Sequence, residues 1–496
     1  MAKTADFLAL DLGAESGRGI VGSLDAGRLT LEVVHRFANG PTRVGGSLYW
    51  DALRLFDEIK RALALAAKRG GVLSGLGIDA WGVDYGLLGR GDVLLGSPYH
   101  YRDSRTDGMM EEAFSRVPQP EIFERTGTQF MQINTIYQLL AMSIQESPLL
   151  QVAEMLLLMP DLFSFWLSGV KAAEFTIATT TQCYDPRARD WAWGLMEKLG
   201  LPTTILPKIV PPGAVLGPLL PDVAEETGAG RVPVIATAAH DTAAAVAAVP
   251  SAGDSYAFIS SGTWSLMGVE VKEPIINEAA REANFTNEGG VEGTFRFLKN
   301  IAGLWLVQES KRTWAKKGVQ LSYDQMAEMA AEAQPFKCII DPDHPRFLLP
   351  GDVPARIGEY CKTTGQAQPQ TRGEAVRTVL EGLALRYRWT IDRLEELTGR
   401  PLDTIHIVGG GCQNRLLCQF TADAAGRPVI AGPVEATAAG NVLVQAMAAG
   451  LIGSLADARE IVRNSFGLER YEPRDTAAWQ DAYGRFQALV PTSPDS

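Results

Sequence analysis

The first residues that could do chemistry are Asp11 and the glycine-containing turn that follows it. The segment 10–18 reads Leu-Asp-Leu-Gly-Ala-Glu-Ser-Gly-Arg. A carboxylate at a strand end, followed by a turn with accessible backbone N–H groups, can hold hydrated Mg²⁺ beside phosphate oxygens. A plain hairpin with an aspartate in its turn explains the same residues, because short glycine motifs are common. Taken alone, this segment leaves both interpretations open.

A second candidate is the carboxylate of Asp241, in the run His240-Asp241-Thr242 ahead of the alanine-rich stretch 243–248. Aspartate or threonine in this position is typical of a helix N-cap, which contributes about 1 kcal/mol to helix stability. The same carboxylate at a helix start could act as a general base. The two interpretations are compatible with each other.

Two further turns could bind a nucleotide. The run 260–264, Ser-Ser-Gly-Thr-Trp, offers hydroxyls and backbone N–H groups that suit a phosphate. The run 408–414, Val-Gly-Gly-Gly-Cys-Gln-Asn, places three glycines between a predicted strand and a predicted helix, where a ribose or a flat ring could approach the backbone. A tight hairpin and a structural turn are the respective alternatives.

Hydrophobic periodicity places these segments on two similar α/β halves. The expected elements are strands at 7–11, 19–22, 29–34 and 77–82, with a helix from about residue 51 to Gly70-Gly71, and, downstream, a strand–turn–strand at 255–269, a helix at about 372–398 and a strand at 404–408. Because the strand–glycine turn–strand opening occurs twice, we expect two related lobes.

Composition excludes several classes of protein. The 46 Lys and Arg against 58 Asp and Glu give a net charge of −12, whereas a nucleic-acid scaffold or a binder of anionic membranes needs a basic face. The five cysteines lack CxxC spacing, which argues against a disulfide framework and a zinc ribbon. With no signal peptide and no apolar run of about 18 residues, we expect a cytoplasmic protein without nucleic-acid or membrane partners.

The order of the four segments is more specific than any one of them, and it resembles the ATPase superfamily of sugar kinases, actin and heat-shock chaperones. Within it the chain is similar to the FGGY carbohydrate kinases from residue 8 to about 450, and among these to the members that phosphorylate L-rhamnulose. The runs that carry the narrower resemblance are 78–84 (Ile-Asp-Ala-Trp-Gly-Val-Asp), 101–105 (Tyr-Arg-Asp-Ser-Arg), 178–182 (Ala-Thr-Thr-Thr-Gln), 239–242 (Ala-His-Asp-Thr), 261–264, 298–305 and 406–411.

The resemblance implies two actin-like, ribonuclease H-like α/β lobes, each with a mixed central sheet flanked by helices, and a cleft between them. The expected domains are an N-terminal lobe for sugar and phosphates (1–249), a C-terminal lobe for the nucleotide (250–460), and a helical segment that packs back and ends in a loose tail (461–496).

The activity that the resemblance implies is phosphorylation of L-rhamnulose at O1 by ATP with Mg²⁺, giving L-rhamnulose 1-phosphate and ADP, in a monomer or homodimer. Another ketose (L-fuculose, xylulose or ribulose) is one alternative substrate. An actin- or chaperone-like ATPase without a small substrate is a second alternative.

The resemblance also assigns roles to single residues. Asp241 is expected to accept the proton of the attacking hydroxyl, and Asp11 to hold Mg²⁺ through water. The expected sugar contacts are Trp81, Gly82, His240, Asp241, Thr242 and Asn300. The expected ATP contacts are Gly13, Ala14, Glu15, Ser16, Gly17, Thr263, Gln308 and Gly410. Glu15 departs from the family, in which a small hydroxyl residue is frequent; its carboxylate repels a phosphate unless it pairs, for example with Arg18, or turns outward.

Overall fold

The computed structural model describes residues 4–347 and 351–490 and divides into two compact units. The first unit comprises Met1–Ala252, Glu270–Phe297 and Ala436–Ser465, and the second comprises Gly253–Val269, Leu298–Glu435 and Phe466–Ser496. Neither unit is continuous in the sequence, and the sequence-based division into domains stays a prediction. The expected loose tail at 491–496 lies outside the described residues.

A six-stranded sheet forms the centre of the first unit, in the order β13-β14-β6-β1-β2-β3. Its strands are β1 (Ala5–Leu12), β2 (Ser16–Asp25), β3 (Arg28–Ala38), β6 (Leu73–Ala80), β13 (Ala214–Pro218) and β14 (Pro233–Ala236). The four strands predicted in this region are confirmed. Because β1 and β14 both run parallel to β6, the carboxyl ends of these three strands meet at one edge of the sheet.

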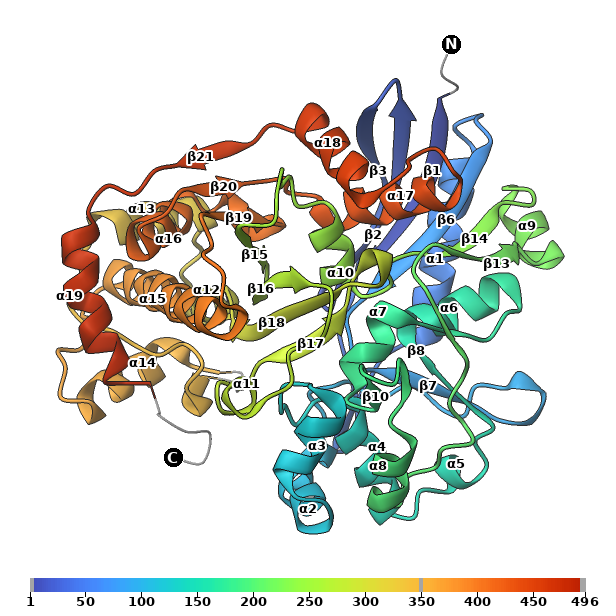
Figure 1. The fold of residues 1–496 in the computed structure, drawn as a ribbon, viewed down its shortest axis with the longest axis horizontal. Coiled ribbons are helices and arrows are strands. Elements are labelled where there is room, and N and C mark those ends of the chain that lie inside the picture. The colour runs from blue at the N-terminus through green and yellow to red at the C-terminus, as the bar shows by residue number, and fades with distance from the viewer. Residues whose placement is uncertain (1–3, 348–350, 491–496) are drawn as a thin grey trace. The chain divides into compact units, whose positions relative to one another are not determined.

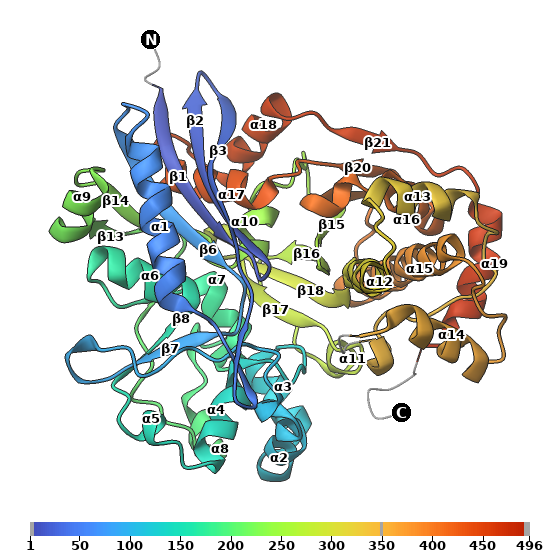
Figure 2. The ribbon, with the colours of Figure 1, turned by 180° about the vertical axis from the view of Figure 1, so that it is seen from behind.

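Alternating residues of β1 and β6 face helices on opposite sides of this sheet. Helix α1 (Ala52–Ala67), which begins after Asp51 as predicted, shares a hydrophobic core with Leu8, Leu10 and Leu12. Figures 1 and 2 show α17 (Ala436–Ala448) on the other face. There, a Cβ atom on Gly77 would lie 2.9 Å from the Asn441 Oδ1 atom. Because Gly77 has no side chain, α17 can approach this part of β6 closely.

Helix α10 (Asp241–Ala247) follows β14 and crosses α17 at very short range. A Cβ atom on Gly440 of α17 would lie 1.7 Å from the carbonyl oxygen of Ala244 in α10. Even a methyl group therefore cannot be accommodated at this crossing. The contact anchors the helix that begins with Asp241.

The other elements of the first unit surround these helices and strands. They are β4 (Thr42–Val44), β5 (Ser47–Tyr49), β7 (Tyr85–Leu88), α2 (Met109–Arg116), α3 (Gln119–Thr126), α4 (Thr135–Ile144), α5 (Pro148–Gln151), β8 (Met155–Leu158), α6 (Met159–Ser168), β9 (Ala173–Glu174), α7 (Phe175–Ala178), β10 (Tyr184–Asp185), β11 (Asp190–Trp191), α8 (Trp193–Leu199), β12 (Ile209–Val210), α9 (Pro221–Thr227), α11 (Glu278–Glu282), β17 (Thr286–Gly289) and α18 (Leu455–Ser465). The short strands β4 and β5 interrupt the predicted β-β-β-α-β order.

The second unit is built on a seven-stranded sheet in the order β17-β18-β16-β15-β19-β20-β21, whose edge strand β17 belongs to the first unit. Its strands are β15 (Tyr256–Ser261), β16 (Trp264–Val271), β18 (Phe295–Ala302), β19 (Thr404–Val408), β20 (Val429–Ala431) and β21 (Glu469–Tyr471), of which the end of β16 and the start of β18 belong to the first unit. Strand β15 pairs antiparallel with β16 and parallel with β19, as β1 does with β2 and β6. The expected pair of mixed-sheet α/β units is confirmed.

The long helix predicted at 372–398 is α15 (Arg372–Thr398), most of whose residues are buried. Thr371 and Glu374 form a capping box at its start, and Gly399 ends it with a φ of 67°. The other helices of this unit are α12 (Trp305–Lys316), α13 (Tyr323–Glu332), α14 (Val353–Thr363), α16 (Arg415–Ala425) and α19 (Thr476–Gln487).

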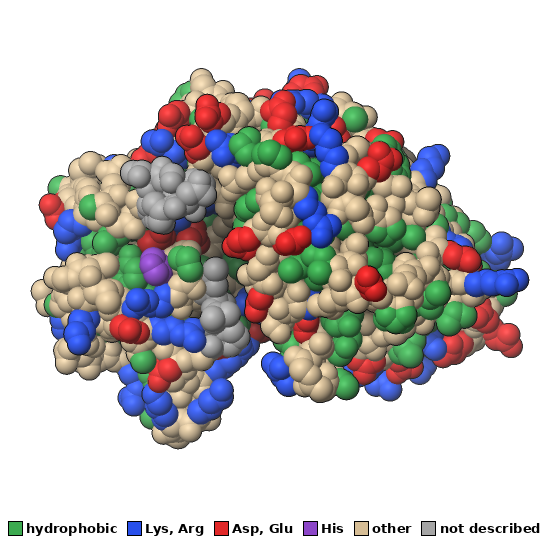
Figure 3. Space-filling model, turned by 90° about the horizontal axis from the view of Figure 1, so that it is seen from below, with side chains coloured by type: hydrophobic (Ala, Val, Ile, Leu, Met, Phe, Trp, Pro, Cys, Tyr) green, Lys and Arg blue, Asp and Glu red, His purple; other side chains and the backbone are tan. Residues whose placement is uncertain are grey.

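Surface charge and helix hydropathy add two observations. On the face drawn in Figure 3, acidic and basic side chains are interspersed. Within residues 4–347 and 351–490, no helix combines the length and the apolar character that crossing a membrane requires.

Gly440→Ala is expected to lower the free energy of unfolding, because the new methyl group overlaps the Ala244 carbonyl oxygen and pushes α10 and α17 apart. Overpacking of this kind costs about 1–3 kcal/mol or more. The matched control is Gly484→Ala at an exposed position of helix α19, where the new Cβ meets nothing within 4 Å. The control is expected to raise stability by up to about 1 kcal/mol. Urea denaturation followed by circular dichroism measures the free energy of unfolding of both variants. If Gly440→Ala were as stable as the wild type, the close crossing of α10 and α17 would be contradicted.

Candidate active site

Two carboxylates lie side by side where β1 and β6 end. Asp11 and Asp79 are partners in the register of the parallel pair, with exposures of 4% and 0%. Arg18 on β2 donates from its NH2 group to Asp11 Oδ2 at 2.6 Å. Asn441 on α17 donates from Nδ2 to Asp79 Oδ2 at 2.6 Å. The acidic residue predicted from the sequence, Asp11, is thus one member of a pair.

Asp79 was missed as a site residue, although an aspartate inside an apolar strand is an unusual feature of the 78–84 run. Burial raises the pKa of Asp79 well above its usual value, and the negative charges of Asp11 and Asp241 act in the same direction. Its Oδ1 atom has no hydrogen-bond partner among the described residues. The carboxyl groups of Asp11, Asp79 and Asp241 therefore interact electrostatically with one another at this edge of the sheet.

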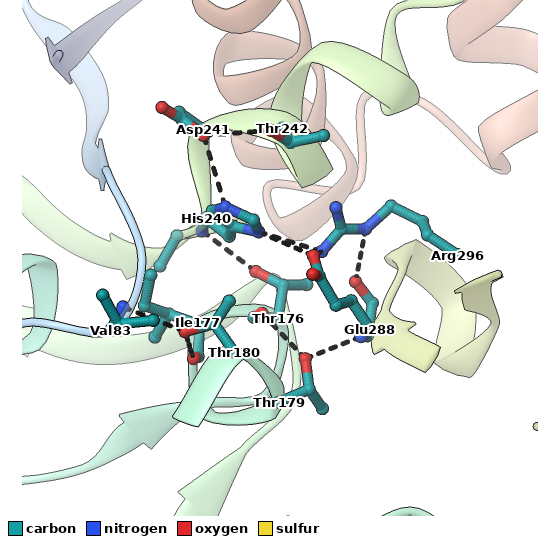
Figure 4. Close-up of polar contacts among 12 residues, drawn as sticks. Val83, Thr176, Ile177, Thr179, Thr180, His240, Asp241, Thr242, Glu288 and Arg296 are labelled. Atoms are coloured by element: carbon teal, nitrogen blue, oxygen red, sulfur yellow. Dashed lines mark hydrogen bonds and ion pairs between the residues drawn. The ribbon is translucent and has the colours of Figure 1, made fainter. Parts of the chain in front are cut away.

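Asp241 presents its carboxylate to the surroundings between two buried neighbours. Its side chain is 34% exposed, whereas His240 and Thr242 are buried. Thr242 donates from Oγ1 to Asp241 Oδ1 at 3.2 Å, and His240 Nε2 lies 3.4 Å from the same oxygen. Figure 4 shows the second carboxylate oxygen turned away from both.

The N-cap interpretation of Asp241 or Thr242 is wrong, because His240 occupies the N-cap position and Asp241 is the first helical residue. The physical reason is that His240 is held in an extended conformation. Its backbone N–H donates to Thr176 Oγ1 at 3.1 Å, and it forms a parallel bridge with Ala80 at the end of β6. The helix can therefore begin only one residue later.

A buried glutamate that the sequence analysis did not single out organises this entry into α10. Glu174 Oε2 accepts hydrogen bonds from the backbone N–H groups of Thr176, Ile177 and Ala239, at 2.9, 3.1 and 3.1 Å. It also accepts from Thr176 Oγ1 at 2.5 Å. Burial raises the pKa of Glu174 to about 7. Its position four residues before the 178–182 run was the only signal that pointed to it.

The predicted sugar contacts Trp81 and Gly82 follow β6 directly and are placed beside His240. Ala80 N donates to Ala239 O at 2.9 Å, so the strand end and the start of α10 are joined through their backbones. A Cβ atom on Gly82 would lie 3.1 Å from Thr180. The structure therefore brings Trp81, Gly82, His240 and Asp241 together.

A buried aspartate holds the indole of Trp81. Asp84 Oδ2 accepts from Trp81 Nε1 at 3.1 Å, from Trp50 Nε1 at 2.6 Å and from Tyr101 N at 3.1 Å. Gln138 donates to the other oxygen at 2.9 Å. Burial raises the pKa of Asp84 to about 6. Because Trp81 is only 5% exposed and its polar atom is occupied, its ring has a fixed orientation.

The predicted phosphate turn connects β1 and β2. Gly13 N donates to Ser16 O at 2.9 Å, which closes the turn. Glu15 is exposed, and Arg18 contacts Asp11. Gly17 is required for packing, since a Cβ atom there would lie 2.2 Å from the ring of Phe37.

In the second unit, two of the predicted nucleotide turns touch each other. Thr263 lies between β15 and β16, and Gly410 follows β19. A Cβ atom on the adjacent Gly411 would lie 2.0 Å from Ser261 Oγ at the end of β15. The turn after β19 thus packs against the end of β15 with no room for a side chain.

Gln308 and Asn300 belong to the same unit. Gln308 lies on α12, which begins at the Thr263 turn, because Trp305 N donates to Thr263 O at 3.0 Å. The Oε1 atom of Gln308 is buried, with no hydrogen-bond partner among the described residues. Asn300 lies near the end of β18.

The predicted site residues therefore form two sets, one in each unit, and their roles stay predictions. The first unit holds Asp11, Gly13, Ala14, Glu15, Ser16, Gly17, Trp81, Gly82, His240, Asp241 and Thr242. The second unit holds Thr263, Asn300, Gln308 and Gly410.

The donor set at the sheet edge fits a hydrated magnesium ion. Over the described part of the chain, no three His, Cys, Asp or Glu side chains cluster closely enough to hold a metal ion by themselves. Asp11 and Asp79 nevertheless offer hard carboxylate oxygens, one of them without a partner. This donor set suits Mg²⁺, which keeps several waters and shares its remaining positions with phosphates.

Comparison with known proteins places the chain in one family. Residues 7–248 match the N-terminal domain, and residues 257–449 the C-terminal domain, of the FGGY family of carbohydrate kinases. The chain is 45% identical to Rhamnulokinase of Bacteroides thetaiotaomicron, over 98% of this chain and 99% of the relative. It is 43% identical to Rhamnulokinase of Oceanobacillus iheyensis, over 94% and 97%. The structure of ligand-bound xylulose kinase from Lactobacillus acidophilus shares the fold, with a TM-score of 0.81, 16% identity and coverages of 98% and 97%.

The titration of Glu174 is expected to make the protein less stable as pH rises. Its pKa of about 7 in the folded state exceeds the value of about 4.3 in an unfolded chain, so between these values the folded state binds more protons. At about 1.4 kcal/mol per pKa unit, the loss between pH 4 and pH 8 is about 3 kcal/mol.

Glu174→Gln cannot ionise and should lack this loss, whereas the exposed control Glu225→Gln should retain it. Urea denaturation of the three proteins at pH 5 and pH 8 measures the difference. The same pH dependence in Glu174→Gln and in the wild type would exclude Glu174 as its source.

Proposed function

The chain belongs to the FGGY family of carbohydrate kinases, and we propose that it transfers the γ-phosphoryl group of ATP to O1 of L-rhamnulose. The products are L-rhamnulose 1-phosphate and ADP. The choice of sugar is supported by relatives that carry the name Rhamnulokinase and are 38–45% identical over 94% or more of this chain. An alternative ketose or an actin-like ATPase is not favoured by these relatives.

The observation that carries the chemistry is the partly exposed carboxylate of Asp241 between buried, hydrogen-bonded neighbours. Both of its contacts use Oδ1, so Oδ2 is available for a proton. The sugar O1 attacks the γ-phosphorus, its proton passes to Asp241 Oδ2, and the bond from the γ-phosphorus to the bridging oxygen of ADP breaks. Such transfers depend on positioning and charge stabilisation more than on covalent help from the protein.

The remaining residues are proposed to hold the two substrates. Trp81, Gly82, His240, Thr242 and Asn300 contact the sugar. Backbone N–H groups of the turn at 13–17 and of Thr263 hold the β- and γ-phosphates. Gly410 lies against the nucleotide, and the unpartnered Gln308 Oε1 accepts a hydrogen bond from a donor group on it.

Asp11 is proposed to hold Mg²⁺ through water, with Asp79 beside it. The ion, when bound, neutralises phosphate charge. Arg18 and Asn441 keep these two carboxylates in place through their 2.6 Å hydrogen bonds. A cytoplasmic location and a monomeric or homodimeric state remain predictions.

Asp241→Asn is expected to lower kcat by about 10²–10⁴-fold, because an amide cannot accept the proton of the sugar hydroxyl. ATP binding, measured by calorimetry, should be unchanged. Asp254→Asn, on the exposed loop before β15, is the matched control and should keep full activity. ADP release measures the rates. Near-normal turnover of Asp241→Asn would remove Asp241 from the mechanism.

L-rhamnulose is expected to be preferred over xylulose and ribulose, which lack its terminal methyl group, by about tenfold or more in kcat/KM, the range that one small apolar group supplies in a binding pocket. L-fuculose carries the same methyl group and differs in the configuration of one hydroxyl, so a preference over L-fuculose depends on the hydrogen bonds of that hydroxyl. ADP release with ATP, Mg²⁺ and each purified ketose tests this. A higher kcat/KM for one of the other sugars would overturn the substrate assignment, and ATP hydrolysis independent of every sugar would overturn the kinase.

A further inference from the structure

A buried ion pair that the mechanism above does not use lies against the imidazole of His240. Glu288 on β17 and Arg296 on β18 are 4% and 0% exposed. The Arg296 NH2 group lies 3.2 Å from Glu288 Oε2 and 3.1 Å from His240 Nδ1. Arg296 Nε donates to the carbonyl oxygen of Gly289 at 2.8 Å, which fixes the plane of the guanidinium. Figure 4 shows the ring of His240 between this pair and Asp241.

The chemistry of arginine decides the protonation of the ring. A guanidinium has only donors and keeps its charge in proteins. Its contact with Nδ1 therefore requires that Nδ1 accept a hydrogen bond. A neutral imidazole with an accepting Nδ1 carries its proton on Nε2. This is the nitrogen that faces Asp241 Oδ1 at 3.4 Å.

Glu288 acts in the opposite direction, since its Oε2 atom also lies 3.3 Å from His240 Nδ1. Alone, a carboxylate there would favour a proton on Nδ1. The Arg296 NH2 group, however, directs its hydrogen bond at Nδ1, while it contacts Glu288 Oε2 as an ion pair without donating a hydrogen bond to that atom. A proton on Nδ1 would instead place two donors against each other at 3.1 Å. Burial lowers the pKa of Arg296, and the negative charges of Glu288 and Asp241 counter that shift.

We propose that Arg296 and Glu288 are positioning residues that hold His240 as the neutral tautomer with its proton on Nε2. This N–H donates toward Asp241 Oδ1, so Oδ2 is left for the proton of the sugar hydroxyl. The proposal rests on the proposed function of Asp241. With the other tautomer, a lone pair of His240 would face the Asp241 carboxylate and repel it.

The ring and the backbone of His240 are controlled separately. The backbone is held by Thr176 and by the bridge to Ala80. The ring contacts Asp241 on one side and the Arg296–Glu288 pair on the other. Replacement of Arg296 is therefore expected to change the tautomer of the ring, while the backbone hydrogen bonds at the start of α10 remain.

Long-range ¹H–¹⁵N correlation spectra of the ¹⁵N-histidine-labelled protein distinguish the tautomers. The chain has only five histidines, and the spectrum of His240→Gln identifies the signals of His240. At neutral pH the wild type is expected to show the Nε2–H tautomer. A ring with its proton on Nδ1, or an imidazolium, would overturn the proposal.

Arg296→Met removes every donor while keeping an unbranched chain that replaces the aliphatic part of arginine. Glu288 then remains the partner of Nδ1, so the tautomer is expected to change to Nδ1–H, and kcat to fall about 10–100-fold with the Kd for ATP unchanged. Glu288→Gln is the matched control, because it retains Arg296 and should retain the Nε2–H tautomer. An unchanged tautomer in folded Arg296→Met would contradict the role of Arg296.

The wild-type and Glu288→Gln spectra decide the question even where Arg296→Met does not fold, as judged by circular dichroism. Failure of this proposal and failure of the proposed function are distinguishable. A wild type that phosphorylates L-rhamnulose with His240 as the Nδ1–H tautomer would overturn only the role of Arg296 and Glu288. A wild type with the Nε2–H tautomer and no kinase activity would overturn the proposed function and leave the tautomer assignment.

Discussion

The hydrogen bonds to one buried carboxylate oxygen, Glu174 Oε2, connect the parts of the candidate site in the first unit. Four donors converge on this atom, one of them Ala239 N at the entrance to α10. The same segment is joined to Ala80 at the end of β6. The positions of Trp81 after the strand and of Asp241 at the start of the helix therefore depend on one another. A buried acceptor with this many donors tolerates little displacement, because each unmet donor would lose its hydrogen bond.

Close packing of small residues provides the second constraint. Gly77 in β6 and Gly440 in α17 allow backbone and side-chain atoms to approach where any larger residue would overlap them. This proximity lets Asn441 reach Asp79, and it holds α10 against α17. The polar chemistry at the sheet edge is therefore supported by an apolar, glycine-dependent contact behind it.

Charge at this edge is balanced unevenly, and the imbalance agrees with the proposed chemistry. Asp11 has Arg18 as an ionic partner, whereas Asp79 accepts a hydrogen bond from the neutral amide of Asn441 and has a raised pKa. Asp241 remains partly exposed, with one oxygen uncommitted. An acidic edge of this kind favours a divalent cation and a proton acceptor and disfavours a bare phosphate, so phosphate binding depends on backbone N–H groups and on the cation.

The local pattern of the chain determined the strands around the two glycine turns, the start of α1 at Asp51 and the end of α15 at Gly399, because these depend on neighbours a few residues away. The order of motifs also identified the family and pointed to Asp11 and Asp241. Only the tertiary structure showed that Arg18 contacts Asp11, that His240 occupies the N-cap position of α10, and that Glu174 and Asp79 are buried partners of the site. It alone joined Asn441 to Asp79 and Arg296 to His240. The contacts of Glu174 with Ala239, of Asn441 with Asp79 and of Arg296 with His240 connect residues tens to hundreds of positions apart. No periodicity or spacing in a single sequence encodes which distant donor meets which buried acceptor.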